Sequence, residues 1–192
     1  MKFPGIGTRQ AKRFVYFLLA QNPHFVDELA QEIANLRKNI AQCPSCFRFY
    51  PRTTATPLCA LCADESDSGT LLVVEKDTDF ESVRRSGSYA GKYFILGGTI
   101  PVLATDPASK IRIHELTARI EQGVPEGLSE IILALSVTPE SDFTREYIIK
   151  TLEPLAKKHK LSITTLGRGL STGTELEYSD SDTLRYALKN RG

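Results

Sequence analysis

No stretch of this 192-residue sequence approaches the length of a membrane-spanning helix, which needs about 18 apolar residues in a row. A secretory signal is also lacking. Arg9, Lys12 and Arg13 precede the apolar run 14–20, but that run is too short for a signal peptide, and Leu18-Leu19-Ala20 is a poor cleavage site. We therefore expect a cytoplasmic protein with no membrane partner.

The chain also lacks a large net charge of either sign. Its 24 Lys and Arg residues against 23 Asp and Glu residues give +1, which excludes binding to nucleic acid by bulk charge alone. The total hides an asymmetry, because residues 1–62 carry eight basic and three acidic side chains, whereas 63–192 carry sixteen and twenty. We expect any polyanion to bind the basic N-terminal third, although unevenly charged, solvated surfaces would give the same count.

Cysteine is scarce, and all four cysteines fall into two Cys-x-x-Cys pairs, Cys43/Cys46 and Cys59/Cys62, with twelve residues between them. Zinc prefers such a set of four thiolates in a tetrahedron. Two disulfides are the alternative, which the lack of a secretion signal disfavours. A redox site would need one pair rather than two matched pairs. We predict one structural Zn²⁺ per chain, in a closed site with no open position for catalysis.

Two helical segments are expected before the cysteines. The first runs to about Gln21, with apolar residues at helical spacing that predict one face packed in a core: Ala11, Phe14, Val15, Leu18 and Leu19. The second runs from about Phe25 to Ile40.

The turn Pro4-Gly5-Ile6-Gly7 stands immediately before the first helical segment. It has the form of the hairpin in a helix–hairpin–helix element, whose glycines let the backbone N–H groups at a helix start approach a DNA phosphate. Any tight turn before a helix would look the same. The DNA-binding candidates are Gly5, Gly7, Arg9, Lys12 and Arg13, followed by Arg37 and Lys38.

After Asp64, short apolar runs alternate with helical patterns. Strands are expected at 71–74, 93–96, 130–135 and 161–166, with helices beginning near Asp77 and at 111–122 and 142–159, and a loop at 136–141. This alternation predicts a parallel α/β sheet, whose binding sites lie beyond the carboxyl ends of its strands.

Four acidic residues occupy such strand ends and the helix starts that follow them: Glu75, Asp79, Glu140 and Asp142. If they converge, they form a Mg²⁺ site of the kind that serves phosphoryl transfer. The alternative is that they are acids at helix N-termini, which the helix dipole favours. For Asp79 and Asp142 we expect helix caps.

The order of these motifs resembles the RecR family of recombination mediators over nearly the whole chain, from Pro4 to about Leu188. The resemblance is sharpest in the cysteine quartet, in 91–98 and in 175–183. It implies a mixed α+β and α/β chain of four parts: a partial helix–hairpin–helix DNA-binding region (1–41), a four-cysteine zinc finger (42–65), a Toprim domain (66–166) and a C-terminal segment (167–192). It also implies DNA and proteins like RecO and RecF as partners, recombinase loading at gapped or damaged DNA, and ring-like tetramers.

The Toprim fold also occurs in enzymes, whose catalytic members pair the first glutamate with a later Asp-x-Asp. Here Glu75 is present, but the later position reads Ser136-Val137-Thr138, and hydroxyls cannot replace two carboxylate ligands of Mg²⁺. We predict no catalytic residues and no enzymatic activity, with any Mg²⁺ being non-catalytic. The alternatives are a small Mg²⁺-dependent Toprim nuclease or primase and a zinc-ribbon adaptor that never touches DNA, which the basic N-terminal third disfavours.

Four departures from the family pattern are visible. The family's glycine-rich segment after the second strand reads Pro-Val-Leu-Ala-Thr-Asp at 101–106. Ser141 replaces the glycine of the family's Glu-Gly-Glu, and Arg168 stands where a histidine is typical. Only Met1-Lys2-Phe3 precedes the Pro-Gly turn, so the first helix of the helix–hairpin–helix element is shortened. We therefore expect a dimer at low concentration, with closure of a tetrameric ring weakened.

Overall fold

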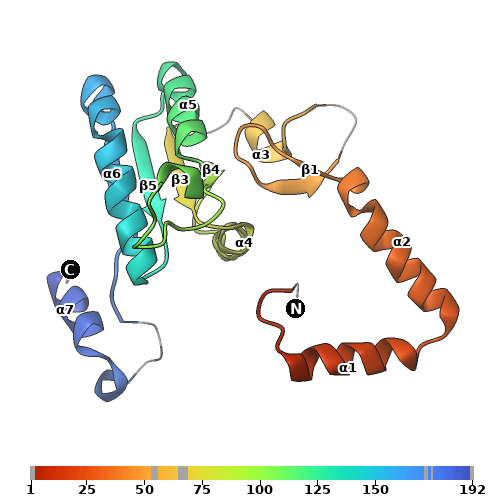
Figure 1. Cartoon of the computed structure of the whole chain (residues 1–192). Helices are drawn as coiled ribbons and strands as arrows, with labels where there is room; N and C mark the ends of the chain where they lie inside the picture. The colour runs from red at the N-terminus through yellow and green to blue at the C-terminus, as the bar shows by residue number, and fades with distance from the viewer. Residues whose placement is uncertain (1–2, 53–55, 65–68, 171–172, 174, 191–192) are drawn as a thin grey trace. The chain divides into compact units, whose positions relative to one another are not determined.

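The structure is a computed structural model that describes residues 3–52, 56–64, 69–170, 173 and 175–190; Met1 and Lys2 of the short N-terminal segment lie outside them. The chain divides into two compact units (Figure 1). The first comprises Met1–Gln42 and Phe49–Ala55, and the second Cys43–Arg48 and Thr56–Gly192. Within the described residues, no helix is long and apolar enough to cross a membrane.

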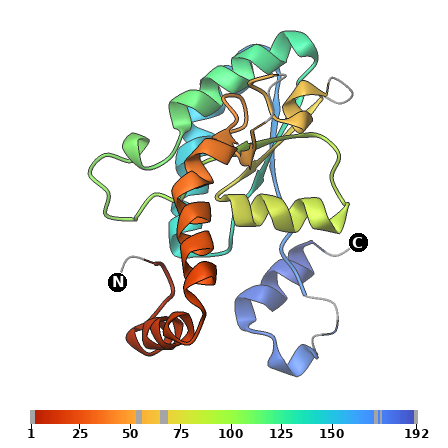
Figure 2. The ribbon, with the colours of Figure 1, turned by 90° about the vertical axis from the view of Figure 1, so that its right-hand side faces the viewer.

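The first unit contains two helices and a small hairpin (Figure 2). Helix α1 spans Thr8–Leu19 and helix α2 spans Pro23–Asn39, which confirms both predicted helices. The Asn22 side chain caps α2 by accepting the N–H of Phe25 at 2.8 Å, and the proline at the first position has no N–H to leave unpaired. Strands β1 (Ile40–Gln42) and β2 (Phe49–Pro51) pair antiparallel.

The apolar face of α1 does not pack in a core, so that expectation is wrong for the chain on its own. None of the described residues of α1 is buried, and Phe17 is 52% and Leu19 75% exposed. The ring of Phe17 meets that of Phe25 edge-on, with centroids 6.0 Å apart. Two helices and a hairpin of two three-residue strands supply too little surface to cover this face, because a stable core needs packed layers of secondary structure.

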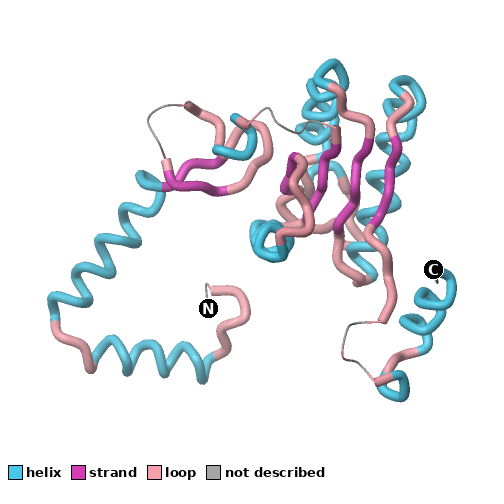
Figure 3. The backbone as a smooth tube through the Cα atoms, turned by 180° about the vertical axis from the view of Figure 1, so that it is seen from behind, coloured by secondary structure: helices cyan, strands magenta, loops and turns pink. Residues whose placement is uncertain are grey.

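The second unit is built on a four-stranded sheet in the order β4-β3-β5-β6, in which every neighbouring pair is parallel (Figure 3). Its strands are β3 (Thr70–Val74), β4 (Lys92–Ile95), β5 (Glu130–Ala134) and β6 (Ser162–Thr165), and its main helices are α4 (Asp77–Ser86), α5 (Ile113–Gly123) and α6 (Pro139–His159). The predicted parallel α/β sheet is therefore confirmed.

Helices cover both faces of this sheet, and the alternation of side chains along β3 shows how. Leu71 and Val73 pack in a core with residues of α5 and α6, such as Leu116 and Ile148. Leu72 and Val74 point to the other face, where they pack in a second core with Phe80 of α4. Burial on both faces explains why the strand is apolar from Leu71 to Val74, and each such side chain contributes about 1.5–3 kcal/mol.

Several elements were not predicted from the sequence. They are β1, β2, the short helix α3 (Ala60–Ala63), helix α7 (Ser181–Lys189) and the 3₁₀ turns η1 (Ala108–Lys110), η2 (Val124–Glu126) and η3 (Leu176–Tyr178). Helix α6 also begins at Pro139, three residues before the expected start. This earlier start places Glu140, Ser141 and Asp142 in its first turn.

Candidate metal centre, acidic site and nucleic-acid surface

The four cysteine side chains gather at one point of the second unit. The sulfurs of Cys43, Cys46, Cys59 and Cys62 all lie within 4.8 Å of one another, and those of Cys46 and Cys59 are 3.6 Å apart. A tetrahedral zinc–thiolate site, with bonds of about 2.3 Å, requires sulfurs about 3.8 Å apart. All four cysteines are free, so the arrangement matches a metal centre and not the alternative of two disulfides.

Tight turns in the backbone bring the first pair of sulfurs together. The N–H of Cys43 donates to the carbonyl of Arg48, and the N–H of Phe47 donates to that of Cys43, both at 2.9 Å. Phe47 has φ = 62°, a left-handed conformation that glycine adopts far more readily. The first Cys-x-x-Cys turn is therefore closed at the cost of an unusual backbone at Phe47.

Packing of the Phe47 ring accounts for a bulky residue at that position. The ring meets Phe94 of β4 at a centroid distance of 5.4 Å, and the guanidinium of Arg112 lies over it at 5.1 Å. The carbonyl of Cys46 also accepts the N–H of Ile95 at 2.9 Å. The first cysteine turn is thus fixed to the edge strand of the sheet.

The second cysteine pair is held to the same strand by Lys92. Its side chain is buried, and its ammonium donates to the carbonyls of Leu61, at 3.1 Å, and Asp64. A buried ammonium needs such acceptors. Sequence reasoning missed this residue, although a single lysine opening the apolar run 93–96 is the signal that could have found it.

The chemistry of the thiols also suits a cation. Hydrogen bonding between the side chains of Cys43 and Cys46 lowers the pKa of Cys43 and raises that of Cys46. Four thiolates cannot lie this close without a positive charge among them, and a divalent ion supplies that charge and displaces the protons. The residues therefore fit the predicted zinc ion.

We expect removal of zinc to destabilise the whole second unit, because both cysteine pairs are joined to β4. A loss of about 3 kcal/mol would lower the unfolding midpoint by roughly 6–12 °C. Calorimetry before and after chelation, with elemental analysis of the untreated protein, measures this. Zn²⁺ should restore the midpoint and Mg²⁺ should not; a protein purified without zinc, with an unfolding midpoint insensitive to the chelator, would contradict the prediction.

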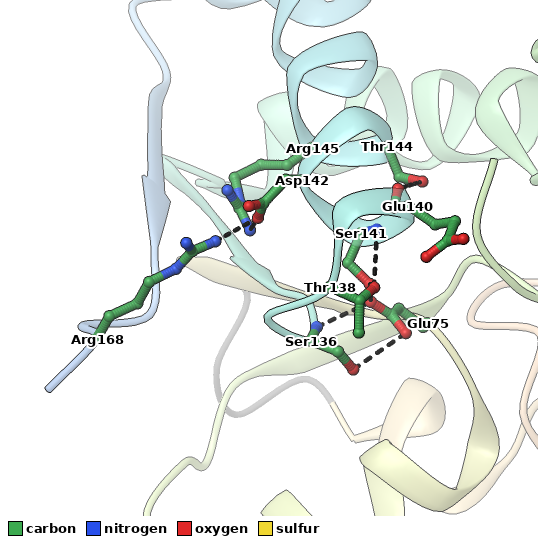
Figure 4. Close-up of polar contacts among 9 residues, drawn as sticks. All are labelled: Glu75, Ser136, Thr138, Glu140, Ser141, Asp142, Thr144, Arg145 and Arg168. Atoms are coloured by element: carbon green, nitrogen blue, oxygen red, sulfur yellow. Dashed lines mark hydrogen bonds and ion pairs between the residues drawn. The ribbon is translucent and has the colours of Figure 1, made fainter. Parts of the chain in front are cut away.

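The acidic site centres on Glu75, which follows β3 and is only 3% exposed. Its carboxylate accepts the N–H of Ser136 at 2.8 Å, the hydroxyl of Ser136 at 3.2 Å and the hydroxyl of Ser141 at 2.5 Å (Figure 4). A buried carboxylate is tolerated only with donors of this kind. Both oxygens of Glu75 are therefore engaged by the protein.

Thr138 extends this set of hydroxyls and forms the cap of α6. Its oxygen accepts the N–H of Ser141 at 3.2 Å, and its hydroxyl donates to the Ser141 oxygen at 2.9 Å. Ser141 in turn donates to Glu75. The hydroxyl protons of Thr138 and Ser141 therefore both point along this row of hydrogen bonds toward the carboxylate. The N-cap of α6 is thus Thr138, and the expectation that Asp142 caps this helix is wrong.

Two of the other three acids bind other partners, and the third is exposed. Asp79 accepts the N–H of Lys76 at 3.0 Å, so it caps the start of α4 as expected, and burial raises its pKa. Glu140 is exposed. The carboxylate of Asp142 binds the guanidinium groups of Arg145 and Arg168, and Figure 4 shows it apart from the Glu75 group.

The pKa of Asp142 reflects those two arginines. Burial alone would raise it, but the hydrogen bonds from Arg168 and Arg145 outweigh burial and hold the pKa of this carboxyl below its usual range. Asp142 is thus a charged partner of arginine at neutral pH. Through this ion pair, Arg168 joins the segment after β6 to helix α6.

A Mg²⁺ ion does not fit this edge of the sheet. Among the described residues, only the four cysteines bring three or more potential ligand atoms together. Magnesium demands near-octahedral oxygen ligands, whereas the one buried carboxylate, Glu75, is surrounded by O–H and N–H donors whose positive ends oppose a cation. The four acids predicted as a cluster are therefore not brought together as a group of ligands among the described residues.

We expect Glu75→Gln to lower the stability by about 2 kcal/mol, because the amide turns an N–H toward hydroxyl donors and leaves buried groups unpaired. Urea unfolding of this variant, beside the exposed control Glu140→Gln, measures the loss. Mg²⁺ should leave the midpoint of the wild type unchanged. Stabilisation by Mg²⁺ that disappears in Glu75→Gln would instead identify Glu75 as a metal ligand.

The basic N-terminal candidates lie together around the start of α1. Gly5 has φ = 72°, and Gly7 is the N-cap of α1, without a side-chain cap. No atom lies within 4 Å of the position of a Cβ at either glycine, so the backbone there is open to approach. Arg9, Lys12 and Arg13 are exposed on α1; Arg37 and Lys38 lie in the last turn of α2.

The sheet order, the glutamate after β3 and the attached cysteine centre define a protein with a Toprim-type domain and a four-cysteine finger. Comparisons with known proteins agree, because a Toprim family model matches residues 69–166 and a RecR C-terminal model matches 169–191.

Curated relatives extend the match to the whole chain. Proteins named Recombination protein RecR from Pelobacter propionicus and Amoebophilus asiaticus are 35% and 38% identical over 190 residues, covering 99% and 98% of this chain and 90% and 89% of theirs. That from Bacteroides thetaiotaomicron is 36% identical over 191 residues, covering 99% and 88%. The chain belongs to the RecR family of recombination proteins, as the motif order predicted.

Proposed function

We propose that this protein is a non-enzymatic, DNA-binding mediator of recombinational DNA repair. The observation that carries the proposal is the state of Glu75, whose carboxylate is bound by the hydroxyls of Ser136 and Ser141 in a fold whose enzymes use that residue with a metal. The family membership supports the role in recombination. The protein then acts by binding and assembly.

The finer parts of this proposal follow the family resemblance. The protein works in the cytoplasm with RecO-like and RecF-like partners to load recombinase at gapped or damaged DNA. One structural Zn²⁺ per chain holds the finger through the four cysteines. The working parts are the DNA-binding region 1–41, the finger 42–65, the Toprim domain 66–166 and the C-terminal segment 167–192.

Exposed cations at the start of α1 support a DNA-binding role for the N-terminal region. Backbone N–H groups at an uncapped helix start favour an anion, and Arg9 and Arg13, four residues apart, lie next to that start. Gly5 and Gly7 allow close approach and Lys12 adds charge. Such contacts bind phosphates without reading sequence.

Replacing both Arg9 and Arg13 by Gln should therefore reduce the slope of log K against log salt by up to about two, because two fewer counterions are released from DNA. Fluorescence anisotropy across a salt series measures the slope. Arg84→Gln with Arg85→Gln, exposed on α4, makes the same charge change and should have no effect. An unchanged slope in the Arg9/Arg13 variant would move the site toward Arg37 and Lys38.

The exposed apolar face of α1, which includes Phe14 and Phe17, is suited to contact a second copy of the chain. A tetrameric ring needs two kinds of subunit contact, because one isologous interface closes at a dimer. Burial of a few hundred square ångströms at about 25 cal/mol per Å² yields several kcal/mol. We propose that this face makes the weaker contact and that dimers form first.

Sedimentation over a concentration series should show dimers at nanomolar protein and tetramers only at higher concentration. Phe14→Ser with Phe17→Ser should remain dimeric throughout, whereas Leu103→Ser, which removes another exposed apolar side chain (93% exposed), should behave as the wild type. A tetramer that persists at nanomolar concentration without DNA would contradict the weak contact.

The alternative is a small Mg²⁺-dependent Toprim nuclease or primase. Nuclease and primer-synthesis assays across a Mg²⁺ and Mn²⁺ titration separate it from the mediator. DNA cleavage or primer synthesis that Glu75→Gln abolishes would overturn the non-enzymatic proposal, while DNA binding without turnover supports it.

A further inference from the structure

A cavity of about 340 Å³ lies between α6, the segment after β6 and helix α7. Its lining includes Asp142 and Arg145 of α6, Arg168, and Tyr186 and Lys189 of α7. The cavity opens just beyond the carboxyl end of β6, which is where parallel α/β sheets bind their ligands. It is separate from the Glu75 group and from the cysteine centre, and neither site explains it.

Two arginine side chains converge in this cavity. Arg145 and Arg168 are each only 17% exposed, and each places one terminal nitrogen on the same oxygen of Asp142 (Figure 4). A guanidinium carries five N–H donors in a planar fork. The contact with Asp142 occupies one terminal nitrogen of each guanidinium. The two arginines therefore carry more N–H donors than this one carboxylate oxygen can accept.

The position of Arg168 is fixed before any ligand binds. Its guanidinium lies over the ring of Tyr186 at 5.0 Å, and its carbonyl accepts the side-chain N–H of Asn190 at 2.8 Å. Arg145 is held on α6, a helix of 21 residues. Rigid donors lose little freedom on binding, which favours affinity.

The charges around the cavity favour an anion. Arg145, Arg168 and Lys189 line it with Asp142 and Glu146, which leaves one positive charge in excess. Asp142 itself shows that an oxyanion fits between the two guanidinium groups. A phosphate group carries about −1.5 to −2 charges and three terminal oxygens, so it would satisfy more of these donors than one carboxylate does.

We propose that this cavity binds a phosphate group, with Arg145 and Arg168 as its main donors and Lys189 as a further cation. Asp142 holds the arginines in position and yields them when the phosphate enters. The phosphate is either that of a small free molecule or the terminal phosphate of a DNA strand. This site does not depend on the DNA-binding surface proposed at Arg9 and Arg13.

Titration calorimetry of the full, zinc-loaded protein with inorganic pyrophosphate tests the site. Arg168→Gln should weaken binding by about tenfold or more, because a charge-assisted pair is lost, and Arg168→Lys should fall between Gln and the wild type. Lys150→Gln, which removes an exposed charge from the same helix, should not change the affinity. Thermal unfolding of each variant verifies that it is folded.

Asp142→Asn separates a ligand site from a purely structural ion pair. Loss of the competing negative charge should tighten pyrophosphate binding several-fold, whereas a cluster that only holds α7 in place would bind no anion in either form. No binding by the wild type, equal binding by Arg168→Gln, or no gain in Asp142→Asn would overturn the proposal. A dicarboxylate that binds as tightly as pyrophosphate would also overturn it, in favour of an acidic peptide.

Competition identifies the source of the phosphate. Displacement of pyrophosphate by a 5′-phosphorylated oligonucleotide, but not by its unphosphorylated counterpart, supports a DNA end; no displacement by either supports a free phosphate compound. The Arg9/Arg13 variant should bind pyrophosphate as the wild type does. If Arg9 and Arg13 proved not to bind DNA, pyrophosphate binding to the cavity would be unaffected. Likewise, a cavity that binds no phosphate would leave the DNA-binding proposal intact.

Discussion

Burial of the Glu75 carboxylate is the constraint around which the functional edge of the sheet is organised. A charge at 3% exposure needs donors close by, and they come from the residues after β5 and from the first turn of α6. The carbonyl of the same residue accepts the N–H of Gly97 after β4 at 2.9 Å. Glu75 thus connects the ends of β3, β4 and β5 with the start of α6. The groups that donate to its carboxylate occupy the positions around it that a cation would need.

The cysteine centre depends on the same sheet in a different way. The backbone of Phe47 forms part of the first cysteine turn. Its ring packs against Phe94 in the core of the sheet domain. Lys92 does the converse, because it is a strand residue whose ammonium reaches the carbonyl of Leu61 beside the second cysteine pair. A metal ion bound by the thiols would therefore stabilise β4, and an intact β4 would stabilise the metal site. The cysteine centre is thus structurally part of the sheet domain.

Residues that act through local sequence could be predicted, and residues that act through distant partners could not. Strands β3 and β4 were visible because their apolar residues are buried on both faces, and the cysteines because a four-thiolate metal site requires paired spacing. The early start of α6 was missed, although a threonine followed by proline at 138–139 is a helix-start signal. Asp142 was wrongly expected to be a helix cap, since its partner Arg168 is 26 residues away. The apolar face of α1 was misplaced because helical spacing shows that a face is apolar and not what covers it.

The two sets of arginines in this protein differ in a way that bears on function. Arg9 and Arg13 are exposed on one helix, where the proposed DNA contact would depend on released counterions and make little demand on geometry. Arg145 and Arg168 are largely shielded, held by Asp142, and Arg168 also stacks on Tyr186. Shielded, rigid forks are weakly screened by salt and select the shape of an anion. If both proposed sites bind their ligands, rising ionic strength should release DNA from α1 well before it releases a phosphate group from the cavity beside α7.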